Sequence, residues 1–252
     1  MSSRSALRTR ILRPAVALAT AFGLLAPVGP WTGTLDAAPG DQLRMTFDQG
    51  DPLAPNTRVT DVSGFGNHGI VRVKYNGTIT PKDGFAKFPS PCQQESCPNA
   101  MIEISDSGSL DPGTAAFEWG ANIRMRSDET ADGENVLQKG RWGDPGGQWK
   151  LQVDKGGGKP SCVVSGFHAG RESRVVLQAS VGIADNGWHQ VVCRRTSAGV
   201  EIIVDGVVRG SAWMPPVDLS SGASVTIGAK EVAARDNDQF HGRLDEVFMR
   251  LI

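Results

Sequence analysis

Apolar and polar residues alternate in many short runs along this chain, and clusters of Gly, Pro, Asn and Asp separate the runs. Alternation with a period of two is typical of β-strands that bury one face. Beyond the N-terminal apolar segment, no stretch has a convincing helical period. The pattern predicts strands at 42–47, 69–73, 85–88, 101–104, 116–125, 135–139, 149–153, 161–166, 174–177, 188–194, 200–204, 207–211, 224–227 and 243–251.

The clearest turn signal lies between two runs rich in β-branched residues, 200–204 and 207–211. Asp205 and Gly206 join these runs, and an Asp-Gly pair accepts the positive φ angles of a tight two-residue turn. The pair therefore predicts a β-hairpin. Strands this short and this numerous bury their apolar faces by packing into two layers. We predict an all-β fold, a two-sheet antiparallel β-sandwich of the jelly-roll type.

The N-terminal segment has the pattern of a secretory signal. Four arginines lie within 4–13, and an almost entirely apolar run follows at 15–28. A signal at 1–38 with cleavage near Ala38 fits this pattern. A retained anchor is the alternative, although the run is shorter than the ~20 residues of a spanning helix. The sequence thus predicts a secreted, extracellular protein with no membrane span after signal removal.

Composition narrows the partners of the remaining chain. Removal of 1–38 leaves 22 of the 26 basic and 26 of the 27 acidic residues, a net charge of about −4. This mild acidity argues against nucleic acid as a partner. Residues 39–252 are enough for one large all-β domain, and no Pro- or Ser-rich linker divides them. We expect a single domain.

Four cysteines in an exported chain are expected to form disulfides. Cys92 and Cys97 lie close together in a loop bounded by prolines, whereas Cys162 and Cys193 each lie in a predicted strand. Three connectivities are formally open, and these positions favour pairing of Cys92 with Cys97 and of Cys162 with Cys193. The alternative of a four-cysteine zinc site is disfavoured because only one close pair exists, and its spacing is wrong.

The C-terminal quarter carries a family resemblance. A Gly-Trp-His turn at 187–189 leads into a strand, the Asp-Gly hairpin follows, and Phe-His-Gly-Arg-Leu-Asp-Glu-Val-Phe at 240–248 closes the chain. In this order the segments resemble the laminin-G-like jelly roll of the concanavalin A-like superfamily, in the form found in bacterial secreted proteins. The resemblance implies that the first and last strands are neighbours.

A second part of the resemblance is the turn Asp-Val-Ser-Gly-Phe-Gly-Asn-His-Gly at 61–69. Turns dense in Asx and Gly can direct carbonyls inward, and nearby carboxylates complete the oxygen cage that Ca²⁺ prefers. With the first and last strands side by side, the resemblance implies a possible structural Ca²⁺ site from Asp48, Asp61, Asn67 and Asp245. The alternative is that Asp245 is held by hydrogen bonds alone. Strict alternation would place Asp245 on the same face as Val247.

Exposed aromatic residues are candidates for ligand binding, because Trp can stack on the apolar faces of sugar rings. Trp142 and Trp213 lie in turn-like settings and are the candidate platforms. For Trp142 the alternative is a loop anchor. Trp119, Trp149 and Trp188 lie in alternating runs and are expected in the core.

Three function classes remain open at this point. The sequence favours a secreted non-catalytic module that binds a carbohydrate or glycoconjugate through rim loops, a preference that relies on the family resemblance. The alternative is an adhesion or structural module that binds an extracellular protein. An enzyme that degrades glycans is disfavoured, because the superfamily's Glu-x-Asp-x-Glu strand is absent and no nucleophile motif occurs. We therefore expect no catalytic residue.

Overall fold

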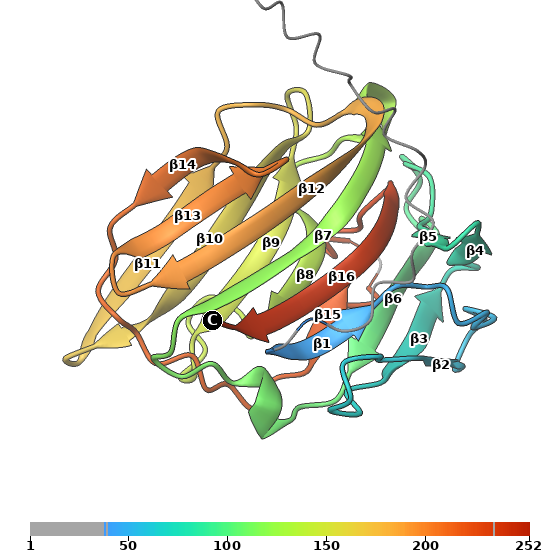
Figure 1. The fold of residues 1–252 in the computed structure, drawn as a ribbon. Helices are drawn as coiled ribbons and strands as arrows, with labels where there is room; N and C mark the ends of the chain where they lie inside the picture. Colours follow the sequence, from blue (N-terminus) through green and yellow to red (C-terminus); the bar gives the residue numbers. More distant parts are fainter. Residues whose placement is uncertain (1–37, 39, 234) are drawn as a thin grey trace, which may run out of the picture. The chain divides into compact units, whose positions relative to one another are not determined.

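Two antiparallel sheets pack face to face (Figure 1). The computed structural model describes residues 38, 40–233 and 235–252, which belong to one compact unit. The predicted signal lies outside the described residues except for Ala38. Sheet A runs in the order β14-β13-β12-β7-β16-β5-β4, and β1 also pairs with β16. Its strands are β1 (Asp41–Met45), β4 (Thr80–Lys82), β5 (Phe85–Lys87), β7 (Phe117–Arg126), β12 (Asp185–Thr196), β13 (Gly199–Val204), β14 (Val207–Ala212) and β16 (Arg243–Leu251).

Sheet B runs in the order β11-β10-β9-β8-β15-β6-β3-β2. Its strands are β2 (Arg58–Val59), β3 (Gly69–Lys74), β6 (Asn99–Ile104), β8 (Glu134–Lys139), β9 (Gln148–Asp154), β10 (Lys159–His168), β11 (Arg171–Gln178) and β15 (Val225–Ile227). Within residues 38, 40–233 and 235–252, the helical segments are two short 3₁₀ turns, Gly108–Leu110 and Ser127–Glu129. In the described part of the chain, no helix has the length and apolar character needed to cross a bilayer.

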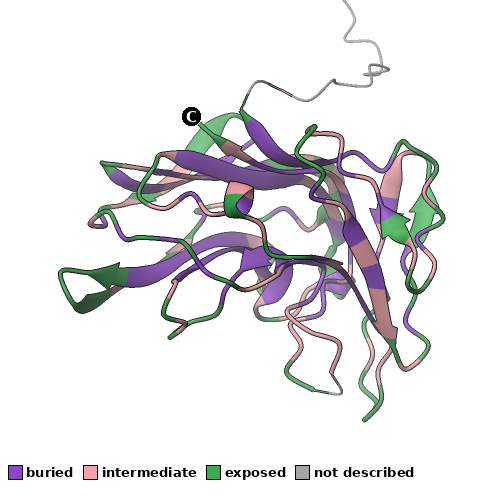
Figure 2. Ribbon diagram, turned by 90° about the horizontal axis from the view of Figure 1, so that it is seen from below, coloured by how far each residue is buried: buried purple, intermediate pink, exposed green. Residues whose placement is uncertain are grey.

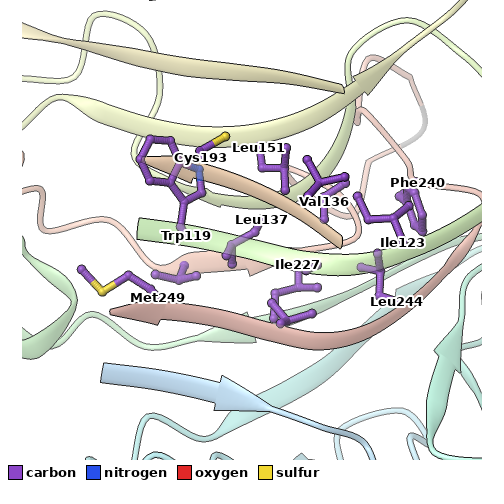
Figure 3. Close-up of a cluster of buried hydrophobic side chains, with 14 of the residues drawn as sticks. Trp119, Ile123, Val136, Leu137, Leu151, Cys193, Ile227, Phe240, Leu244 and Met249 are labelled. Atoms are coloured by element: carbon purple, nitrogen blue, oxygen red, sulfur yellow. The ribbon is translucent and has the colours of Figure 1, made fainter. Parts of the chain in front are cut away.

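The hydrophobic core fills the space between the sheets, and buried segments occur in both layers (Figure 2). Apolar side chains from both sheets meet there, among them Trp119 of β7 and Leu151 of β9 (Figure 3). The rings of Trp119 and Trp149 lie 6.0 Å apart between centroids and join sheet A to sheet B. Large aromatic side chains of this kind supply much of the apolar area that a sandwich core buries.

The predicted strands are all present, and the predicted turn has the expected backbone. Asp205 and Gly206 have φ angles of 52° and 76°, as a two-residue hairpin turn with two positive φ angles requires. Strands β2 and β4 were not predicted; they have two and three residues, too few for an alternation to be seen. The prediction that the first and last strands are neighbours is confirmed by the pairing of β1 with β16.

The predicted disulfides are also confirmed. Cys92 pairs with Cys97 within one loop, and Cys162 of β10 pairs with Cys193 of β12. The second bond crosses the core and ties sheet B to sheet A. It closes a segment of 31 residues, so it restricts the unfolded chain more than the short loop does.

Two predictions about side-chain direction are wrong. Trp188 is 40% exposed rather than in the core, and it lies on the surface of sheet A against Phe85, with 5.5 Å between ring centroids. Asp245 does not share a face with Val247, because the pairing of β16 with β7 shifts between Asp245 and Phe248. Glu246 has a φ of 52° in this bulge, so Leu244 and Val247 both point into the core.

Candidate binding groove on sheet B

A row of side chains crosses the outer face of sheet B, the face turned away from sheet A. The strand register pairs Gln138 of β8 with Lys150 of β9, and Lys150 with Val163 of β10. Leu137 and Leu151, their neighbours in sequence, are fully buried in the core. Because successive side chains of a strand alternate between faces, the row lies on the outer side of the sheet.

Two loops rise beside this row and turn the outer face into a groove. The loop after β8 carries Trp142, and the loop after β15 carries Lys230 and Asp238. They enclose a cavity of about 330 Å³, and an adjoining cavity of about 220 Å³ extends toward β6. We call these two cavities together the sheet B groove. The larger cavity is lined by Gln138, Arg141, Trp142, Gln148, Lys150, Gln152, Val163, Arg174, Lys230, Glu231, Asp236 and Asp238.

Trp142 stands at the rim of the groove and is 62% exposed. Two residues of the edge strand β11 hold its indole. The Nε1–H donates a hydrogen bond to Oε1 of Glu172 at 2.5 Å, and the guanidinium carbon of Arg174 lies 4.7 Å from the ring centroid. An indole fixed by a hydrogen bond and a cation–π contact loses little further side-chain entropy on binding. Trp142 is exposed, as a platform requires, and is held in place, as a loop anchor requires; its role in ligand binding stays a prediction.

Ion pairs fix the loop after β15 onto the sheet. The Nζ atom of Lys150 lies 2.8 Å from a carboxylate oxygen of Asp238, and Lys230 contacts both Asp236 and Asp238 at 3.0 and 3.4 Å. Burial lowers the pKa of the Lys150 ammonium group, and the carboxylate of Asp238 opposes that shift. The Lys150–Asp238 pair joins the loop to the sheet, and the two Lys230 pairs brace the loop internally, so the wall of the groove is held at a defined distance from its floor.

Arg141 and Glu231 form a further ion pair across the groove, with 3.1 Å between a guanidinium nitrogen and a carboxylate oxygen. The floor adds primary amides, those of Gln138, Gln148 and Gln152. Gln138 and Gln148 already donate to the Gly140 carbonyl, at 2.8 and 3.4 Å, so the amides offer their remaining N–H and carbonyl groups to the hydroxyls of a polar ligand.

The floor residues were not predicted as site residues. Gln148, Lys150 and Gln152 alternate with buried Trp149 and Leu151, a pattern that any half-exposed strand gives. Only the loops that cover the strand turn its polar face into a groove. An unusual stretch of amide and lysine side chains in one strand was the available signal.

The second predicted platform, Trp213, does not lie at this groove. It follows β14 at the edge of sheet A and is 75% exposed. It lines a separate cavity of about 380 Å³ with Arg194 and Glu201, which are themselves paired at 3.2 Å. The two predicted platforms therefore belong to different sheets and cannot contact one small ligand together.

Asp61 and Asn67, two of the predicted metal ligands, lie together in a hydrogen-bonded turn. The carboxylate of Asp61 accepts from the backbone N–H groups of Arg44, Ser63 and Asn67 at 2.8 to 3.0 Å, and from the Ser63 hydroxyl at 2.7 Å. The Asn67 side chain donates to the Gln42 carbonyl at 2.7 Å. Four donors occupy the carboxylate, so Asp61 does not fit the part of a metal ligand.

Asp245 and Asp48, the other two, lie on the sheet A side. Asp245 accepts a hydrogen bond from the Glu246 N–H at 2.7 Å, as the hydrogen-bonded alternative expects. Burial raises the pKa of Asp245 to about 7, and the charges of Glu246 and Asp48 add to the shift. Among the described residues, no group of three or more His, Cys, Asp or Glu side chains is arranged to hold a metal ion. The Ca²⁺ site stays a prediction without support from these contacts.

Solved structures with the same fold include binding domains of toxins and one domain of an extracellular arabinanase. Domain 4 of AbnA, an extracellular arabinanase from Geobacillus stearothermophilus, in complex with arabinotriose, has a TM-score of 0.61 and 16% identity over 84% of this chain and 92% of that domain. The binding domain of Paraclostridial Mosquitocidal Protein 1 has a TM-score of 0.57 and 14% identity over 84% of this chain and 49% of that one. The binding domain of botulinum neurotoxin DC in complex with rat synaptotagmin II gives 0.53 and 13%, over 84% and 48%.

This chain spans about half the length of the toxin domains it matches. At such low identities the likeness establishes the fold alone. A comparison with curated proteins gave no match. A laminin-G-like family model, described as the concanavalin A-like lectin/glucanases superfamily, matches residues 99–249. Because this match spans more than half of the sequence and the two-sheet fold agrees with it, the chain belongs to the concanavalin A-like lectin/glucanases superfamily.

Proposed function

We propose that this chain is a non-catalytic binding module that holds a carbohydrate in the sheet B groove. The observation that carries the proposal is the exposed indole of Trp142, fixed at the rim of a groove with a polar floor. Aromatic faces bind the apolar faces of sugar rings, and amide and charged groups bond their hydroxyls. The groove offers both kinds of contact within one cavity.

The structural neighbours support a binding role. Domain 4 of the arabinanase is similar over nearly its whole length and was solved with arabinotriose. Acidic residues that line the groove form ion pairs: Asp238 pairs with Lys150 and Lys230, and Glu231 pairs with Arg141. A carboxyl group held between ammonium groups is poorly suited to donate a proton to a glycosidic oxygen. The two disulfides support an oxidising, extracellular setting for the module.

A protein partner is the second candidate, and a different surface favours it. Val207 and Val208 at the β13–β14 hairpin are about half exposed, and Trp213 lies just beyond the end of β14. These exposed apolar side chains lie at the two ends of the edge strand β14, and exposed apolar surface of this kind is typical of protein contacts. The neurotoxin domain solved with synaptotagmin has the same fold.

A glycan array with three proteins separates the two candidates: the wild type, Trp142→Ala and Trp213→Ala. We expect wild-type binding to a carbohydrate that weakens about tenfold or more in Trp142→Ala, the loss of roughly one stacking contact. Trp213→Ala is the matched control, because it removes another exposed indole from the other sheet. Equal binding by Trp142→Ala and the wild type contradicts the proposed groove.

A further inference from the structure

In the larger cavity of the sheet B groove, one basic side chain has no acidic partner within the described part of the chain. This cavity is lined by four cations and three acids. Three of the cations have acidic partners: Arg141 with Glu231, Lys150 with Asp238, and Lys230 with Asp236 and Asp238. The remaining cation is Arg174. Among the described residues, no carboxylate oxygen lies within 4.0 Å of its guanidinium nitrogens.

Arg174 lies at the Trp142 platform, where a bound ligand would meet its charge. Its guanidinium stacks over the exposed ring of Trp142, the platform of the proposed site. Glu172, two residues earlier on the same face of β11, binds the indole N–H. Stacking engages the flat face of a guanidinium and leaves its N–H donors in the plane available. Because the guanidinium covers one face of the indole, a sugar stacks on the other face. A substituent that reaches past the edge of the ring then meets the in-plane N–H donors of Arg174, beside the Glu172 carboxylate.

We infer that the carbohydrate taken by the sheet B groove carries an oxyanion, a carboxylate or a sulfate, and that Arg174 binds this group beside the Trp142 platform. The inference rests on the proposed function and names its ligand class. The planar fork of an arginine matches the two oxygens of such a group in a bidentate contact. The anion supplies the acidic partner that Arg174 lacks among the described residues, so neutral sugars bind less well.

The test uses a glycan array of matched pairs: uronate and sialylated oligosaccharides beside their carboxyl-reduced forms, and sulfated glycosaminoglycan fragments beside their desulfated forms. The wild type is expected to prefer the anionic member of at least one pair by about tenfold. The preferred pair identifies the carboxylate or the sulfate as the group bound. Added salt is expected to weaken the preference.

Two variants assign the preference to Arg174. Arg174→Gln is expected to remove the preference. Any change that the lost cation–π contact makes to the Trp142 platform affects both members of a pair equally, whereas Arg174→Lys, which keeps a cation, restores the preference in part. Arg171→Gln is the control, because it removes the same charge from the same strand outside the groove lining. A preference unchanged in Arg174→Gln, or equal wild-type binding of both members of every pair, overturns the inference and leaves the proposed function standing. Absence of binding to every glycan overturns both.

Discussion

Glu134 is a buried acid, and its ionisation in the folded protein costs free energy. It begins β8 and is fully buried, and the backbone groups of Ala131 and His241 near its carboxyl offset only part of the cost of ionisation. Burial raises its pKa to about 9, and the charge of Glu129 adds to the shift. In the unfolded chain the pKa returns to its ordinary value of 4.5. The protonated form therefore favours folding, and this contribution is complete below pH 4.5 and is lost as the pH rises toward 9.

Glu134→Gln tests this linkage, because glutamine has the shape of the protonated acid and does not ionise. We expect the variant to have a higher free energy of unfolding than the wild type at about pH 8 and a similar one at about pH 4. Urea unfolding at both pH values measures the difference. Glu129→Gln is the control: Glu129 is also buried but pairs with Arg243 at 3.2 Å, so its loss destabilises at pH 8. A Glu134→Gln difference independent of pH contradicts the argument.

Other residue-level features were only partly predictable from the sequence. The Asx- and Gly-rich sequence at 61–69 predicts a turn. It does not predict the hydrogen bonds that the Asp61 carboxylate accepts, because one of the donors is the backbone N–H of Arg44 on a separate strand. Trp142 was recognised as exposed, whereas Arg174 was not singled out. A lone arginine in an alternating strand gives no sign of its neighbours until the loop after β8 is placed against β11.

At the scale of elements, the alternation of residues was enough to place most strands, because each has one face in the core. The face of each side chain was predictable only where pairing is regular. Glu246 adopts a positive φ with a residue type that rarely does so, and the resulting bulge reversed the predicted face of Asp245. The order of strands within each sheet depends on contacts between distant segments, which the local pattern does not contain.

The two disulfides act on different elements, and their removal should differ in effect. Replacement of Cys162 and Cys193 by serine is expected to lower the free energy of unfolding by about 3 to 4 kcal/mol, the estimate for a closed loop of this length. Serine at Cys92 and Cys97 is expected to cost about 2 kcal/mol, because the closed loop is short. Denaturant titration of both double variants measures the order. A larger loss for the Cys92–Cys97 pair contradicts the expectation.

At the scale of the whole molecule, the proposed binding site lies on one outer face of the sandwich, that of sheet B. The sheet B groove and the Trp213 cavity lie on different sheets, with the core between them. A partner on the edge of sheet A therefore leaves the groove accessible. This separation could not be predicted, because Trp142 and Trp213 have similar local sequence settings and differ only in the sheet to which their loops attach.

The stability of the whole fold also tests the Ca²⁺ prediction. The contacts of Asp61 favour a turn held by hydrogen bonds, so we expect the same melting temperature with added Ca²⁺ and with a chelator. Differential scanning calorimetry under both conditions makes the comparison. A melting temperature that rises with the Ca²⁺ concentration would support the metal site instead, and Asp245→Asn and Asp48→Asn would then show which carboxylates bind it.

The bond between Cys162 and Cys193 has a mechanical consequence. Trp142 is held by β11, an edge strand, and Val163 in the groove floor is next to Cys162 in β10. A long polymer anchored in the groove and pulled by flow would load these two strands first and tend to peel them from the sheet one hydrogen bond at a time. The disulfide passes that load from β10 to the interior strand β12, so separation of β10 from the sheet is expected to stop at Cys162.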